Sequence, residues 1–219
     1  MENRLWKENI SNLKKSIWAY TICGLLSSLF GFIEAAVNPV GLSDLFALAN
    51  GDVSAFAPSV WSTLSTVCSV LVIVGYVFFF LSVSKFAKMQ GDAADTAAAG
   101  KLRTAYILLL ISVIVVFIPL LGWLAALVLL IVAYVFMLQS YGALSRSAVL
   151  QPQARDGAAL LRRCTIWTIV AVLVAIIPLI GALAAFIINL IVFFKVLKGW
   201  TMIADGAPVL PDEGMETAG

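Results

Sequence analysis

Long apolar stretches alternate with short basic clusters along the chain. All fourteen Lys and Arg residues fall in four clusters, at residues 4–15, 85–103, 146–163 and 195–198. The stretches between the clusters hold no basic residue and only three acids, Glu34, Asp44 and Asp52. This alternation is typical of membrane-spanning helices whose basic flanks remain in the cytoplasm.

The two long apolar stretches in the second half of the chain, residues 104–140 and 165–197, are too long for one straight span each. Each exceeds 30 residues, so a straight helix would measure more than about 45 Å against a hydrocarbon core of about 30 Å. Each also carries Pro-x-x-Gly near its middle, at residues 119–122 and 178–181. Pro removes a helical hydrogen bond and Gly tolerates a turn, so both sites predict a reversal.

Charge decides how often each stretch crosses the membrane. With one crossing each, the second and third basic clusters would face opposite sides; with two crossings, all four clusters share the cytoplasm, which the positive-inside rule favours. We therefore predict an all-α membrane protein with six transmembrane helices and both termini in the cytoplasm (N-in/C-in). The predicted spans are residues 16–37, 59–86, 103–118, 120–141, 162–177 and 179–200.

The segments outside these spans are short. Residues 1–14 place Leu5, Trp6, Ile10 and Leu13 near one helical face, which predicts an amphipathic helix on the cytoplasmic membrane surface. The transmembrane domain then covers residues 15–204, with an external loop at 38–58 that holds Pro, Gly and Asp but no basic residue. The acidic tail at 205–219 is expected to be disordered.

An internal repeat accompanies the Pro-x-x-Gly turns. Residues 101–126 and 160–185 match at 12 of 26 positions, and a fainter similarity joins 74–82 to 132–140. Because each repeat holds two spans, successive repeats keep one orientation. We predict three helical hairpins that are parallel pseudo-repeats about an axis along the membrane normal.

Composition supports a lipid environment and excludes several kinds of chemistry. The chain is 62% hydrophobic and 12% charged, with mean hydropathy +1.04, whereas a soluble domain is about a quarter charged. The net charge of +2 is spread over the flanks, which argues against a nucleic-acid surface. The three Cys lie in apolar stretches and predict neither a disulfide framework nor a metal site. Since the chain also lacks His, we expect no catalytic residue, metal site or cofactor.

The polar residues within the predicted spans are the candidate functional positions. Asn189 lies near the membrane midplane, where the sister hairpin has Leu130. A midplane amide either hydrogen-bonds another helix or binds a solute. Ser112 lies at a similar depth. We expect the amide of Asn189 to reach Ser112 or a hydroxyl of the second span if its role is structural.

Two further candidates lie in the first two spans. Glu34 is the only acid in a predicted span, near its external end, and is either an interfacial residue or a cation or proton site. A hydroxyl stripe in the second span follows i, i+3, i+4, i+7 spacing and either lines an aqueous vestibule or packs on a neighbour. Its members are Ser62, Ser65, Thr66 and Ser69. Trp61, Trp123 and Trp200 are predicted to lie at the membrane–water interfaces.

Two functions fit these observations. The first is a non-enzymatic membrane protein that packs against the lipid bilayer, itself or other membrane proteins, in a structural or interaction role. The alternative is a small solute transporter or channel with a polar path near Asn189 and Ser112. A polar cavity reaching Asn189 would favour transport, whereas a dry, close-packed centre would favour the structural role. Without an organellar targeting feature, the expected location is multi-pass in a bacterial inner membrane.

Overall fold

The structure is a computed structural model that describes residues 2–38, 59–115, 118, 121–174, 177 and 180–206. The predicted external loop at 38–58 and the predicted tail at 205–219 lie almost wholly outside these residues. Within the described part, six helices are long and apolar enough to cross a membrane, and no strand occurs. They are α1 (Glu2–Val37), α3 (Val60–Lys88), α4 (Ala93–Val115), α5 (Gly122–Leu144), α6 (Pro152–Val174) and α7 (Ile180–Asp205).

The helices confirm the prediction of an all-α chain with six apolar spans, but several extend beyond the predicted limits. α4 and α6 begin about ten residues before the predicted spans. α1 runs without a break through residues 14 and 15, so residues 2–14 form its first part, where Trp6, Ile10 and Leu13 are buried within the protein. The position of residues 1–14 on a membrane surface stays a prediction.

The chain divides into two compact units that are described separately. Unit 1 holds residues 1–14 and 80–219, and unit 2 holds residues 15–79. α1 and α3 each contribute to both units, since the boundaries fall inside these helices. α4, α5, α6 and α7 belong entirely to unit 1.

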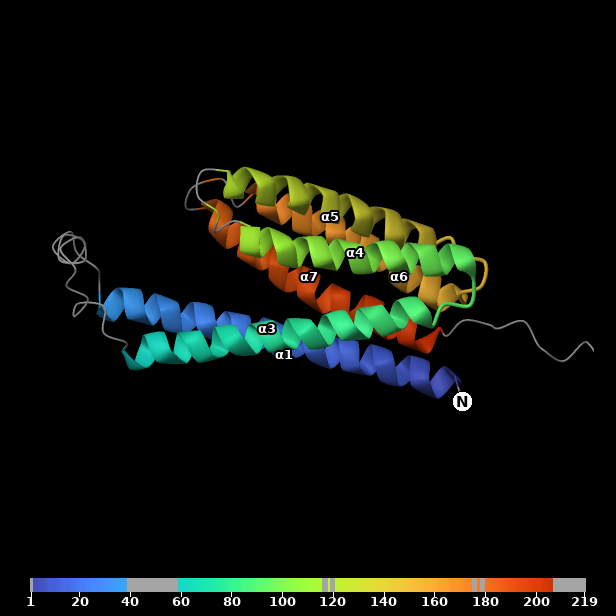
Figure 1. The fold of residues 1–219 in the computed structure, drawn as a ribbon, viewed down its shortest axis with the longest axis horizontal. Coiled ribbons are helices and arrows are strands. Elements are labelled where there is room, and N and C mark those ends of the chain that lie inside the picture. The colour runs from blue at the N-terminus through green and yellow to red at the C-terminus, as the bar shows by residue number, and fades with distance from the viewer. Residues whose placement is uncertain are drawn as a thin grey trace, which may run out of the picture. The chain divides into compact units, whose positions relative to one another are not determined.

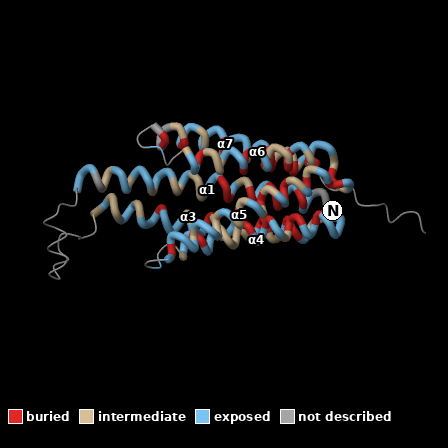
Figure 2. Tube along the Cα trace, turned by 90° about the horizontal axis from the view of Figure 1, so that it is seen from above, coloured by how far each residue is buried: buried red, intermediate tan, exposed pale blue. Residues whose placement is uncertain are grey.

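In unit 1, α4 packs beside α5 and α6 beside α7, while α5 also contacts α6 (Figure 1). The buried positions of α4 gather in its first half, toward the basic cluster. Figure 2 shows buried residues concentrated toward one end of these helices. The packed core of unit 1 therefore lies at the basic ends of the helices.

Contacts from the first residues of α1 bring distant helix ends together in this core. The indole Nε1 of Trp6 donates to the backbone oxygen of Ile203 at 2.9 Å. The amide Nδ2 of Asn9 donates to the backbone oxygen of Ser82 at 3.0 Å. The ring of Trp6 lies 5.2 Å from that of Phe86. The N-terminal end of α1 and the C-terminal ends of α3 and α7 thus meet at one end of unit 1.

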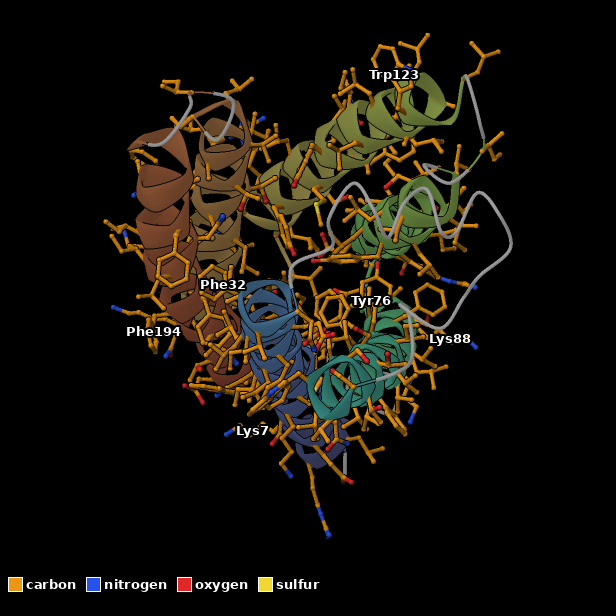
Figure 3. All side chains as sticks on the ribbon, turned by 90° about the vertical axis from the view of Figure 1, so that its left-hand side faces the viewer. Lys7, Phe32, Tyr76, Lys88, Trp123 and Phe194 are labelled. Carbon is orange, nitrogen blue, oxygen red and sulfur yellow. The ribbon has the colours of Figure 1, made fainter. Side chains whose placement is uncertain are left out.

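Trp200 belongs to the same core. Its side chain is 1% exposed, and its ring lies 5.5 Å from Phe86 and 6.4 Å from Tyr141. The prediction of Trp200 as an interfacial belt residue is therefore wrong, because its neighbours enclose it on α3 and α5. Trp123, by contrast, is 64% exposed and projects outward from the start of α5 (Figure 3).

Pro119 and Pro178 themselves lie outside the described residues, but the helices on either side end and begin again there. The amide of Ile118 donates to Val115 O at 3.0 Å, and that of Gly122 donates to Ile118 O at 3.1 Å. The second turn repeats this pattern with Ile177 on Val174 at 3.0 Å and Gly181 on Ile177 at 3.1 Å.

Candidate functional site

The most developed polar feature of the described chain is a hydroxyl seam between α1 and α3 in unit 2. The hydroxyl of Ser27 on α1 shares hydrogen bonds with those of Ser65 and Ser69 on α3, at 3.2 and 2.8 Å. The Ser65 hydroxyl also reaches the backbone oxygen of Ser27 at 3.1 Å. This seam, Ser27 with Ser65 and Ser69, ties the two helices together over about one turn.

Small residues let α1 and α3 approach closely enough to form the seam. A Cβ at Gly75 would lie 3.1 Å from the backbone nitrogen of Tyr20, and one at Gly31 would lie 3.7 Å from the Ser65 hydroxyl. Close backbone approach at Gly and Ser is a common way for helices to associate in lipid, where the hydrophobic effect does not drive association.

Glu34 lies two turns beyond Ser27 on α1. One of its carboxylate oxygens accepts a hydrogen bond from the hydroxyl of Ser59, and the other accepts from the amide of Asn38 at 3.2 Å. Ser59 in turn accepts from the backbone amide of Ser62 at 3.1 Å, as the N-cap of α3. Glu34 therefore joins the end of α1 to the start of α3.

The predicted hydroxyl stripe divides into two parts. Ser65 and Ser69 take part in the seam, whereas Ser62 and Thr66 donate to carbonyls of their own helix. These bonds run from Ser62 to Ser59 O at 3.1 Å and from Thr66 to Ser62 O at 2.8 Å. This intrahelical bonding is the usual state of a hydroxyl in a helix.

Ser112 is buried on α4, and its hydroxyl donates to the backbone oxygen of Leu109 at 2.7 Å. It borders a cavity of about 440 Å³ between α4 and α5. The other lining residues are Val113, Trp123, Ala126, Leu127 and Leu130. Because the remaining lining is apolar, this cavity suits an acyl chain better than a polar solute.

Asn189 is exposed on α7, and its side chain forms no hydrogen bond with any residue that the structure describes. The expected bond from Asn189 to Ser112 or to a hydroxyl of α3 is therefore not formed within this part of the chain. The two midplane candidates of the predicted polar path are not brought together.

The chemistry that the seam offers is limited. Carboxylate and hydroxyl oxygens are ligands for hard cations, but Glu34 is the only acid near the seam among the residues that the structure describes. Among the described residues, no group of three His, Cys, Asp or Glu side chains could hold a metal ion. The arrangement ties helices together and leaves a single carboxylate near one end.

A polar contact outside the spans joins the basic ends of unit 1. The carboxylate of Asp95, in the first turn of α4, accepts a hydrogen bond from the hydroxyl of Ser147 in the α5–α6 loop. Burial raises the pKa of Asp95, the Ser147 hydrogen bond acts in the opposite direction, and the charge of Asp92 raises it further. Ser147 also accepts from the amide of Leu150 at 3.0 Å, which fixes the entry into α6.

Sequence reasoning missed Ser27, Ser59 and Asp95. A signal existed for Ser27, because Ser27, Gly31 and Glu34 follow i, i+4, i+7 spacing on α1 and so share a face. For Asp95 the sequence offered no signal, since its partner lies 52 residues away.

No family model, curated protein or solved structure matches the chain.

Proposed function

We propose that this protein is a non-enzymatic, six-span protein of a bacterial inner membrane with a structural or interaction role. The observation that carries the proposal is the close-packed aromatic core at the basic end of unit 1. Trp200 contacts Phe86 and Tyr141 there, and Val83 and Leu144 are buried beside them along α3 and α5.

The described helices also support three parallel hairpins. α4 and α6 each have 23 residues, and their bounds differ by the same 59 positions that relate the two sequence repeats. Every buried residue of α4 has a buried counterpart in α6 at this offset. The pairs are Asp95/Ala154, Ala98/Gly157, Ala99/Ala158, Leu102/Leu161, Ala105/Cys164 and Ser112/Ala171.

The first hairpin fits the same register at its basic end. On α1, five buried residues each lie 89 positions before a buried residue of α4, as in Trp6 and Asp95 (95 − 6 = 89). These are Trp6, Asn9, Ile10, Leu13 and Ser16. On α3, Ser82, Val83 and Phe86 are buried where α5 buries Ser140, Tyr141 and Leu144. This agreement supports descent of all three hairpins from one helix pair.

The position of the basic clusters supports the N-in/C-in orientation. The start of α1, the α3–α4 and α5–α6 connections and the end of α7 all lie at one end of unit 1, joined by the Trp6–Ile203 and Ser147–Asp95 hydrogen bonds. All four clusters therefore flank the same membrane surface. The positive-inside rule assigns that surface to the cytoplasm and its anionic lipids.

A flux assay in proteoliposomes tests the structural role. Vesicles with purified protein are compared with protein-free vesicles for H⁺, Na⁺ and K⁺ flux by entrapped dyes and for small neutral solutes by osmotic swelling. We expect equal rates in both, because the packed aromatic centre excludes water. Protein-dependent flux of any of these species would contradict the proposal.

The alternative, a small transporter or channel, has one observation in its favour, which is the hydroxyl seam with Glu34 at its end. If flux is found, Ser27→Ala and Glu34→Gln decide its route. Loss of flux in both variants, with Thr66→Val unaffected as the control, would assign the path to the seam. Asn189 and Ser112 offer weaker support, because the structure does not bring them together.

A further inference from the structure

Asn189 is a polar side chain among apolar neighbours, and it forms no hydrogen bond with the residues that the structure describes. Along α7 it lies about 14 Å from Ile180 and about 9 Å from Lys195 at 1.5 Å per residue, so it falls within the hydrocarbon core. Its side chain is exposed. An amide in hydrocarbon without a partner is costly, because both its donor and its acceptor are unsatisfied.

The neighbours of Asn189 decide which partners fit. Phe186, Leu190 and Ile191 beside it are exposed and apolar, and Phe194 projects outward from α7 just beyond them (Figure 3). Because these described neighbours of Asn189 are all apolar, they offer no second polar group to line a water-filled path. The partner must therefore be an apolar helix that carries one donor and one acceptor at the same depth.

We propose that this face of α7 binds the same face of α7 in a second copy of the chain. An interface with two-fold symmetry about the membrane normal places the two Asn189 residues at equal depth. Each amide then donates an Nδ2–H to the Oδ1 of the other, so both groups are satisfied. Another membrane protein would need an independent match in depth, donor and acceptor, whereas a second copy supplies all three.

The inference depends on the membrane location in the proposed function, but not on the absence of transport. The sister hairpin supplies a comparison within the chain. At the position equivalent to Asn189 it has Leu130, which borders the cavity between α4 and α5. The polar residue is therefore specific to the third hairpin and not required by the hairpin fold.

Disulfide crosslinking in native membranes tests the dimer. Cys23, Cys68 and Cys164 are replaced by Ala, and Phe186→Cys, one turn from Asn189 and 55% exposed, serves as the reporter. We expect oxidation to give a covalent dimer on non-reducing gels. Adding Asn189→Leu should lower the yield and weaken association by about tenfold, because it removes both amide hydrogen bonds between the two copies. Asn189→Gln, which keeps the amide, should retain most of the crosslinking yield.

Two controls keep the result interpretable. Leu127→Cys on the sister hairpin, at the position equivalent to Phe186, should crosslink much less. Dilution of labelled protein in liposomes, followed by energy transfer, should show that Asn189→Leu dissociates at higher protein density than the parent. Absence of a dimer, or equal yields with Asn189→Leu, would overturn the proposal. The flux assay is independent of the crosslinking experiment, so the absence of a dimer would not contradict the proposed structural role.

Discussion

At the scale of single residues, the packing of each hairpin depends on small side chains where its helices cross. In the third hairpin, a Cβ at Gly157 would lie 2.7 Å from the backbone oxygen of Gly199. The equivalent positions in the second hairpin are Ala98 and Ser140, both buried. In the first they are Asn9 and Ser82, which are joined by a hydrogen bond. The third crossing is therefore the least tolerant of added volume.

Gly157→Ala tests this tolerance directly. The added methyl must displace the backbone of α7, so we expect a loss of about 1–3 kcal/mol in unfolding free energy, typical of overpacking. Gly100→Ala is the matched control, because a Cβ there meets nothing within 4 Å and Ala favours a helix by up to about 1 kcal/mol over Gly. Both variants are compared by thermal unfolding in detergent. Equal stability of the two would contradict the close approach of the helices at Gly157.

The buried carboxylate of Asp95 predicts that the stability of the folded protein depends on pH. Because burial raises its pKa in the folded state, the folded protein binds this proton more tightly than the unfolded chain does. Its contribution to stability therefore falls as pH rises above the unfolded pKa of 3.8 and through the folded value. Asp95→Asn keeps an acceptor for Ser147 and removes the charge.

We therefore expect Asp95→Asn to flatten the decline of melting temperature as pH rises above about 4, and to be at least as stable as the parent at neutral pH. Asp95→Ala, which leaves the Ser147 hydroxyl without that acceptor, should be less stable than Asp95→Asn at every pH. If the melting temperatures of Asp95→Asn and the parent change with pH in parallel, the pKa of Asp95 is not raised in the folded protein.

At the scale of helices, the sequence predicted which segments are spans and where they break. Length, charge and the two Pro-x-x-Gly sites indicated the ends of α4 and α6 within three residues. The sequence could not predict which face of each helix is buried. The reason is that α5 and α7 are apolar almost all round and carry little amphipathic pattern. The sequence therefore predicted Trp200 at the interface and left Asn189 open between an interhelical bond and a solute site, whereas the fold buries Trp200 and exposes Asn189.

The hydroxyl seam predicts different effects for serines on the same helix pair. Ser27→Ala removes the partner of both Ser65 and Ser69, so it should lower stability by about 0.6–2 kcal/mol, the range for polar contacts between membrane helices. Ser62→Ala removes only an intrahelical bond and should change stability by a few tenths of a kcal/mol. Equal effects in a detergent unfolding series would show that the seam does not stabilise the pair.

At the scale of the whole molecule, the helices are longer than the membrane requires. α1 has 36 residues, about 54 Å at 1.5 Å per residue, against a hydrocarbon core of about 30 Å. The excess lies at the basic ends, where most of the large buried side chains of unit 1 are found. Under the proposed orientation, this packed core of unit 1 would lie toward the cytoplasm.

The most direct test of this account is the side of the membrane on which the basic connections lie. Single Cys residues at Asp92 and at Gln153, both exposed, are introduced into the chain lacking its native Cys, with Asn38→Cys as the external reference. An impermeant maleimide applied to intact cells should label position 38 alone, and positions 92 and 153 only after permeabilisation. Labelling of only one of positions 92 and 153 in intact cells would mean that the stretch at 104–140 does not cross twice. Labelling of both in intact cells would contradict the cytoplasmic placement of the basic connections.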